Sequence, residues 1–255
     1  MPYQPIENYG LIGNMRTTAL VGMDGSIDWF CFPHFDSPSV FASILDDQKG
    51  GHFKISPHCD GLTHKQYYWP DTNVLVNRFL SPDGVGRVLD FMPVGFKNSD
   101  ASCNGIVRRV QAIRGTMAFR LECRPAFNYA REDHTTTLIP DGAIFESASL
   151  TLRLGARVPL KQERNGIVAE FVLKEGEEAD FSLQSIDPTG NGPFHFFVGQ
   201  AEELFRQTVD FWRRWLAKCT YTGRWREMVY RSALALKLLT FEPTGAIIAA
   251  PTCSL

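Results

Sequence analysis

The chain has 255 residues, which is enough for one large domain or two modest ones, and its hydrophobic share of 44% and charged share of 21% are those of an ordinary globular protein. A net charge of −2 with interleaved signs supplies no basic stripe, so we expect no nucleic-acid partner. No apolar run approaches the ~20 residues of a membrane span, and residues 1–10 lack a signal-peptide pattern, so we expect no membrane partner.

The six cysteines are scattered without Cys-x-x-Cys pairs, and the chain contains no Asn-x-Ser/Thr acceptor. Both features favour a reduced, cytoplasmic compartment. A group of His and Cys residues is spaced unlike any standard zinc site, and we interpret it as a surface loop: His52, His58, Cys59 and His64. Gly190-x-Gly192 precedes no strand-to-helix unit, so it is no phosphate loop. We therefore predict neither a metal nor a cofactor.

Between about Gly10 and Asp187 the sequence has the period of two that is typical of strands with one buried face. Apolar and polar residues alternate over Met117–Cys123, Ser147–Leu154 and Glu178–Gln184. Hairpin dipeptides separate such runs, at Asp24-Gly25, Asp83-Gly84, Asp141-Gly142 and Asn165-Gly166. Roughly ten to twelve strands are too many for a simple open sheet, so we predict a large two-sheet antiparallel β-sandwich. Within it, only Pro38–Leu45 favours a short helical turn.

The pattern changes at the Pro/Gly cluster of residues 188–193, which is a candidate boundary. After it, apolar residues follow a period of 3.6 over Ala201–Leu216 and predict an amphipathic linker helix. A second helix is predicted over about Gly223–Phe241, and its second half is apolar on nearly every side. Such a helix must be buried on most of its surface. Residues 246–250 favour a short strand.

These elements divide the chain into a β-sandwich (1–190), a linker helix (191–222) and the start of an α-helical domain (223–255). The second helix lacks partners in the sequence, and the chain stops on an apolar segment. We therefore expect the chain to be the front part of a longer protein.

The densest group of candidate functional residues lies in the stretch Gly22–Phe41. Trp29, His34 and Asp36 combine an aromatic face with polar groups, which suits the apolar face and the hydroxyls of a sugar. The structural interpretation is that Asp24 serves the turn, Asp28 points outward from the strand and Asp36 caps the turn at Ser37-Pro38. Both interpretations stay open at this point.

Several motifs, in the same order along nearly the whole chain, resemble the N-terminal domain and the first barrel helix of glycoside hydrolase family 15, the glucoamylase, glucodextranase and trehalase-like enzymes. They are Tyr9–Asn14, Asp24–Trp29, Phe35–Phe41, Asp90–Pro93, Arg124–Arg131, Arg231–Leu239 and Pro243–Thr252. The chain departs from the usual family residues at His34, Asn128, Ala130 and Cys253.

The resemblance implies a large β-sandwich joined by a linker helix to an (α/α)6 barrel. It implies inverting hydrolysis of an α-glucosidic bond, glucoamylase- or trehalase-like and without a cofactor, by two glutamates about 6.5–9.5 Å apart. In the family both glutamates lie in the barrel, so no catalytic residue is expected in this chain. The expected partners are an α-glucoside or oligosaccharide and the chain's own C-terminal barrel, and homo-oligomer formation is left open.

A second set of residues is predicted to face that barrel: Arg124, Asn128, Tyr129, Arg131, Trp212, Trp215 and Trp225. The first four form a polar and aromatic cluster at a strand end, and the tryptophans follow helical spacing. The substrate-binding prediction for Trp29, His34 and Asp36 then means that their loop leans over the barrel mouth. The alternative is a non-catalytic β-sandwich module that binds carbohydrate or a protein partner.

Overall fold

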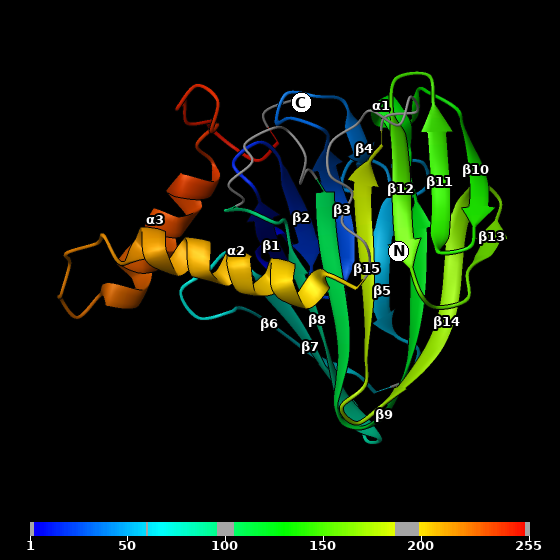
Figure 1. The fold of residues 1–255 in the computed structure, drawn as a ribbon, viewed down its shortest axis with the longest axis horizontal. Coiled ribbons are helices and arrows are strands. Elements are labelled where there is room, and N and C mark those ends of the chain that lie inside the picture. Colours follow the sequence, from blue (N-terminus) through cyan, green and yellow to red (C-terminus); the bar gives the residue numbers. More distant parts are fainter. Residues whose placement is uncertain (1–2, 60, 96–104, 187–198, 253–255) are drawn as a thin grey trace.

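The computed structural model describes residues 3–59, 61–95, 105–186 and 199–252, and it consists mainly of antiparallel strands (Figure 1). The first strands are β1 (Tyr9–Gly13), β2 (Thr18–Gly22), β3 (Ser26–Cys31), β4 (Ser39–Phe41), β5 (His52–Pro57), β6 (Thr63–Tyr68), β7 (Leu75–Leu80) and β8 (Gly84–Phe91). The later strands are β9 (Gly105–Arg124), β10 (His134–Ile139), β11 (Gly142–Ser147), β12 (Thr151–Ala156), β13 (Lys161–Glu163), β14 (Gly166–Lys174) and β15 (Glu178–Ser185). The helical elements are η1 (Ile6–Asn8), α1 (Phe127–Ala130), α2 (Ala201–Leu216) and α3 (Arg226–Leu238).

The strands form two layers that share the long strand β9. The first layer runs β1-β2-β3-β5-β9-β14-β13, with β4 beside β3. The second layer runs β6-β7-β8-β9-β15-β12-β11-β10. Residues 105–115 of β9 pair within the second layer, and residues 116–124 pair within the first. The predicted β-sandwich is thereby confirmed, with one strand continuing from layer to layer.

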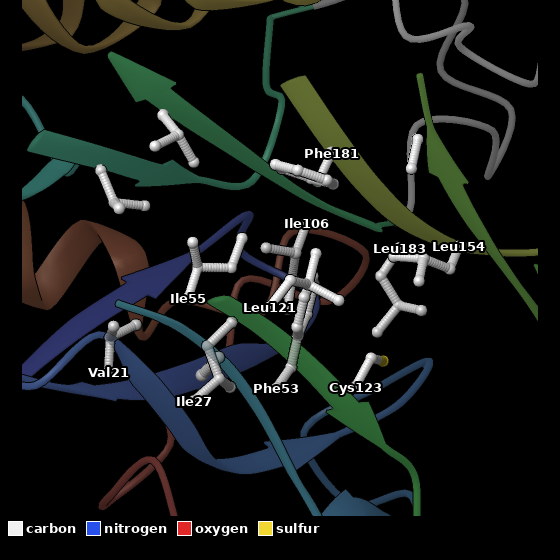
Figure 2. Packing of buried hydrophobic residues seen from close by; sticks show 14 of the residues in the cluster. Val21, Ile27, Phe53, Ile55, Ile106, Leu121, Cys123, Leu154, Phe181 and Leu183 are labelled. Carbon is white, nitrogen blue, oxygen red and sulfur yellow. The ribbon is translucent and has the colours of Figure 1, made fainter. Parts of the chain in front are cut away.

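The core of the sandwich lies between these layers. Figure 2 shows side chains from strands of both layers pointing toward one another, among them Phe53, Leu121 and Phe181. Each of these three side chains is at most 1% exposed. Because burial of a large apolar side chain contributes about 1.5–3 kcal/mol, this cluster is the main source of the stability of the sandwich.

A buried ion pair crosses the same core. Arg108 of β9 and Asp90 of β8 are both fully buried, and the guanidinium contacts both carboxylate oxygens at 2.7 and 3.2 Å. Arg108 also donates to the backbone oxygens of Gly25, at 2.7 Å, and Phe53, and it lies 4.8 Å from the Phe53 ring. Asp90 and Arg108 belong to the second layer, whereas Gly25 and Phe53 belong to the first. One side chain therefore ties the two layers together.

The predicted turns are confirmed. All four hairpin dipeptides mark the connections of paired strands. Asp24-Gly25 lies between β2 and β3, whereas the glycines of Asp83-Gly84, Asp141-Gly142 and Asn165-Gly166 begin β8, β11 and β14. At Gly25, φ is +82° and a Cβ atom would meet the Ile55 oxygen at 2.2 Å. Only glycine fits that turn.

Two local predictions are wrong. Residues 147–154 are not one strand, because Ser147 and Leu150 close a turn with a backbone hydrogen bond of 3.0 Å between β11 and β12. The alternation continues through this turn, so periodicity alone does not show it. Pro38–Leu45 contains the strand β4, which pairs with β3, so the predicted helical turn is confined to its end, where the amides of Leu45 and Asp46 both donate to the Ala42 oxygen.

Helix α2 confirms the predicted amphipathic helix over Ala201–Leu216 and packs on the outer face of the second layer. Its residues Ala201, Leu204 and Val209 join a cluster with residues of β7, β8 and β9 that include Val76, Leu89 and Val107. Arg109 of β9 also binds the first turn of α2, because its guanidinium pairs with Glu202 as well as with Glu178 and Asp180 of β15. The side chain of Arg109 is 3% exposed, so these carboxylates enclose it.

Helix α3 is shorter than the predicted range and is buried on one side only. Leu234 and Leu238 are at most 2% exposed, whereas Met228 and Leu236 are 64% and 57% exposed. The expectation that this helix is buried on most of its surface is therefore not met within the described residues. In place of the predicted short strand, Thr240 and Ile247 form an isolated bridge. The boundary cluster 188–193 lies outside the described residues, so the division 1–190, 191–222 and 223–255 stays a prediction.

The chain reverses sharply after β9. Asn128, Tyr129 and Ala130 have φ of 51°, 58° and 61° in succession. Asparagine tolerates this left-handed conformation, whereas alanine and tyrosine are strained in it. This backbone conformation holds the Tyr129 ring against Trp29, with the ring centroids 6.4 Å apart.

Replacing Asp90 with Ala is expected to lower the free energy of unfolding by about 3–5 kcal/mol, because it leaves the Arg108 charge buried without its partner. The double variant Asp90→Leu/Arg108→Met should recover only part of this loss, since the oxygens of Gly25 and Phe53 then lack a donor. Urea denaturation measures all three proteins. Arg206→Met, which breaks the exposed pairs with Glu202 and Glu203, is the control and should cost less than about 1 kcal/mol. Equal losses for Asp90→Ala and the control would contradict the assigned role.

Replacing Ala130 with Gly is expected to stabilise the chain by about 1 kcal/mol, because glycine adopts positive φ without strain. Ala118→Gly is the matched control, since Ala118 is also exposed but lies within β9, where the backbone is extended. There the same change should destabilise by about 0.5–1 kcal/mol. The shift in thermal midpoint should therefore have opposite signs in the two variants.

Candidate functional site

The loop after β3 carries two of the predicted substrate-binding residues. The His34 amide donates to the Ser37 hydroxyl at 3.0 Å, and the Ser37 amide donates to the His34 oxygen at 3.2 Å. Ser37 therefore closes this turn, and the predicted cap from Asp36 is wrong. Asp36 is exposed and His34 is half-buried, so both side chains lie on one accessible loop.

The segment after α3 packs against this loop. The Phe241 ring meets the rings of His34 and Phe35 edge-on, with centroids 5.8 and 6.0 Å apart. The backbone amide of Glu242 donates to the Met15 oxygen at 2.8 Å, and its carboxylate lies 3.4 Å from the Arg16 side chain. The segment after α3 therefore meets both the connection between β1 and β2 and the His34–Asp36 loop, and Figure 1 shows this red segment beside blue strands.

Trp29 lies inside the protein rather than on this loop. Its side chain is fully buried, and its Nε1 donates to the Pro251 oxygen at 3.0 Å. The indole ring is accordingly closed off from solvent by described residues and holds the last described segment in place. His34 and Asp36 share one loop. Trp29 is not on this loop, and its link to the segment after α3 is the hydrogen bond to Pro251.

The nearby carboxylates have structural partners. Asp24 serves the predicted turn by accepting from the Ser26 amide at 3.2 Å, and it pairs with Lys54 at 2.5 Å. Burial alone would raise the pKa of Asp24, but Lys54 and the hydrogen bonds outweigh it and lower this pKa below its usual value. Asp28 is only 9% exposed and accepts from the hydroxyls of Tyr9, Ser26 and Ser43. The prediction that Asp28 points outward is wrong.

The predicted interface residues fall into two groups. At the strand end, Arg124 pairs with Glu163 at 3.3 Å, Asn128 donates to Glu132 at 3.0 Å, and Arg131 lies 5.8 Å from the Tyr129 ring. The other group comprises the three tryptophans: Trp212 is fully buried, Trp215 is half-buried, and Trp225 is 53% exposed. Trp212 and Trp215 pack with Met15 and Leu238, whereas Tyr129 packs with Trp29.

A hollow of about 520 Å³ separates α3 from the turn after β6, and the sequence did not indicate its residues as a site. Its wall contains Arg231, whose guanidinium stacks 3.9 Å from the Tyr68 ring and donates to the Thr72 oxygen at 2.9 Å and to Asn73. Burial lowers the pKa of Arg231 below its usual value. Trp69 and Tyr230 also line the hollow. The available signal was only that Arg231 stands just before the apolar run that begins at Ala233.

A second hollow, of about 630 Å³, is apolar and lies on α3 itself. Its lining contains residues that are exposed or half-buried in this structure: Trp225, Met228, Val229, Ser232, Ala233 and Leu236. Arg231 and Leu234 fix the opposite side of the helix to the sandwich. The helix is thus held in place with one apolar face outward.

In the described part of the chain, no group of three or more His, Cys, Asp or Glu side chains is placed to hold a metal ion. His52 lies 3.4 Å from Glu122 and His64 contacts the Met23 oxygen, so the histidines have separate partners. Among the described cysteines, Cys59, Cys123 and Cys219 are free. None of the described helices has the length and apolar character needed to cross a bilayer.

Comparison with known proteins agrees with this architecture. A family model described as trehalase-like, N-terminal, matches residues 2–156. The chain is 35% identical to a trehalase of Thermoplasma volcanium over 99% of its length, and 37% identical to a trehalase of Thermoplasma acidophilum over 92%. It is 30% identical to a trehalase of Mycobacterium tuberculosis over its whole length. In each case it spans 40% of the relative. The chain belongs to the trehalase-like N-terminal domain family.

Proposed function

We propose that this chain is the N-terminal portion of a cytoplasmic, inverting glycoside hydrolase that acts on the α-glucosidic bonds of trehalose or of a related α-glucoside. In this proposal the chain supports a catalytic (α/α)6 barrel and does not itself carry the acid/base pair. Relatives named trehalase support the substrate class. The free thiols of Cys59, Cys123 and Cys219 fit a reducing compartment.

The observation that carries the supporting role is the outward apolar face of α3. Large apolar side chains at that level of exposure are typical of a surface that another part of the protein covers. Arg231, Asn73 and Leu234 anchor the other side, so the helix presents this face in one fixed orientation. The barrel is the proposed occupant.

The titratable groups of the chain favour the same role. A general acid of an inverting enzyme needs a raised pKa and access to the substrate. In the described residues, Asp180 is the carboxyl whose pKa is raised, because of burial, and it is enclosed with Arg109 at 2.8 Å. The pKa of Glu122 is lowered instead, because its arginine and histidine neighbours outweigh the effect of burial.

The His34–Asp36 loop keeps its proposed role as a contact of the substrate at the barrel mouth. Its neighbours support this role, because Phe241 and the residues after it lead from α3 to the same place. Trp29 contributes indirectly in this proposal, by holding Pro251.

The second candidate function is a non-catalytic module that binds carbohydrate. The polar and aromatic hollow beside Arg231 favours it, since aromatic faces combined with charged groups suit a sugar. Calorimetry of the chain with trehalose, maltose and isomaltose tests this function. Binding at millimolar concentration or tighter that Tyr230→Ala abolishes would support the module.

The purified chain is expected to release no glucose from trehalose or maltose, because the proposed acid/base pair lies outside it. A coupled glucose assay measures release, with the Thermoplasma acidophilum trehalase as the positive control. Turnover by the chain that persists after further purification would contradict the proposal.

Charging the outward face of α3 is expected to abolish docking of the barrel. A chimera in which this chain replaces the corresponding part of the Thermoplasma acidophilum trehalase provides the test. Met228→Asp and Leu236→Asp should each lower the activity of the chimera more than about tenfold, while changing the stability of the isolated chain by less than about 0.5 kcal/mol, because both side chains are exposed there. Val172→Asp is the control, since Val172 is 58% exposed on the sandwich. Unchanged activity in both α3 variants would contradict the assigned face.

A further inference from the structure

Three cations stand side by side on the outer face of the second layer. In the pairing register, Lys65 of β6 lies opposite Arg78 of β7, and Arg78 lies opposite Arg87 of β8. Directly opposed residues of antiparallel strands have Cβ atoms about 4.5–5.5 Å apart, so like charges in this arrangement repel and destabilise the sheet. We call Lys65, Arg78 and Arg87 the cation row.

The cation row is not neutralised within the described residues. Arg78 has a buried Nε atom without a hydrogen-bond partner, and no ion pair joins Lys65 or Arg78 to a described carboxylate. The row continues across β9 and β15 with Gln111 and Glu178, but Glu178 is engaged by Gln111 at 2.9 Å and by Arg109 at 2.7 Å. The cation row therefore lacks a partner of opposite charge within the described residues. Leaving the buried Arg78 Nε donor unsatisfied also costs free energy.

Arg87 is held in position for such a partner. Its Nε donates to Gln111 at 2.8 Å, and its guanidinium lies 5.3 Å from the centroid of the Trp69 ring. Burial lowers the pKa of Arg87, and the charges of Arg78 and Arg109 lower it further, although Tyr67 acts in the opposite direction. The guanidinium of Arg87 is therefore held in one position, close to the positive charges of Arg78 and Arg109.

The row borders α2 but remains accessible. One step along the same strands, Val76 and Leu89 lie in the apolar cluster under α2. In the row itself Lys65 is exposed, while Arg78 and Arg87 are half-buried. Tyr67, next to Lys65 on the same face, is 40% exposed. The outer face of the second layer thus presents hydrogen-bond donors from β6, β7 and β8 beside helix α2.

We propose that Lys65, Arg78 and Arg87 form a binding site for a small oxyanion, a phosphate or a carboxylate group, on the outer face of the second layer. Guanidinium groups bind such oxygens through paired, charge-assisted hydrogen bonds, and the ammonium of Lys65 adds a third donor. A bound anion neutralises the row and removes the cross-strand repulsion. This site does not depend on the proposed hydrolase function.

Thermal unfolding of the purified chain tests the site. Phosphate, sulfate and acetate are titrated separately at constant ionic strength, with chloride as the reference salt. A specific site raises the Tm by about 5 °C or more at a hundredfold excess over its dissociation constant. A response to phosphate and sulfate alone identifies a tetrahedral anion, and a response to acetate identifies a carboxylate. An equal response to chloride reflects screening only and overturns the proposal.

Variants separate binding from general charge effects. Arg78→Met should abolish the anion response and, at low salt without the anion, raise the Tm slightly because the repulsion is removed. Lys65→Met removes an exposed side chain and should weaken the affinity several-fold without affecting folding. Arg164→Met, an exposed arginine in another turn, should keep the full response. If the Lys65 and Arg78 variants both respond like the unchanged chain, the proposal is wrong.

Discussion

The arrangement of this protein depends on a buried guanidinium. Arg108 joins Asp90 in one layer to the backbone of Gly25 and Phe53 in the other, within an apolar core. A buried charge is tolerated only where its donors are paired, so the two layers have little freedom to slide while this network is intact. The turn at Gly25, the strand β5 and the strand β8 are thereby held in register around one side chain.

The next residue extends this constraint to the outer surface. Side chains alternate along a strand, so Arg108 points into the sandwich and Arg109 points away from it. Arg109 binds Glu178 and Asp180 of β15 and Glu202 of α2, which fixes the start of the helix on the outer face. Helix α3 then packs through Leu234 and Leu238 beside Trp212 of α2. The orientation of the apolar face of α3 follows from this chain of contacts, beginning in β9.

Local signals predicted the parts of the fold that depend on neighbouring residues. The hairpin dipeptides and the period of 3.6 in α2 reflect backbone and side-chain geometry within a few residues, and both were correct. The turn after Ser147 was missed because alternation continued through it. The residues around the candidate sites were predictable only in part. The sequence placed His34 and Asp36 together on a loop, and their substrate-binding role stays a prediction. Arg231, Asn73 and Tyr68 come together from distant positions. Trp29 was identified, but nothing local indicates that Pro251 covers it.

Periodicity and short motifs are properties of adjacent residues, so they were enough to predict the class of fold, the turns at the hairpin dipeptides, the amphipathic helix and the resemblance to a family. The burial and the grouping of the charges depend instead on how distant strands pair. Positive and negative residues are interleaved along the chain, and on that basis no basic stripe was expected. Strand register nevertheless aligns Lys65, Arg78 and Arg87, and Asp28 turns inward to three hydroxyls, because the pairing of strands sets side-chain neighbours across the sheet.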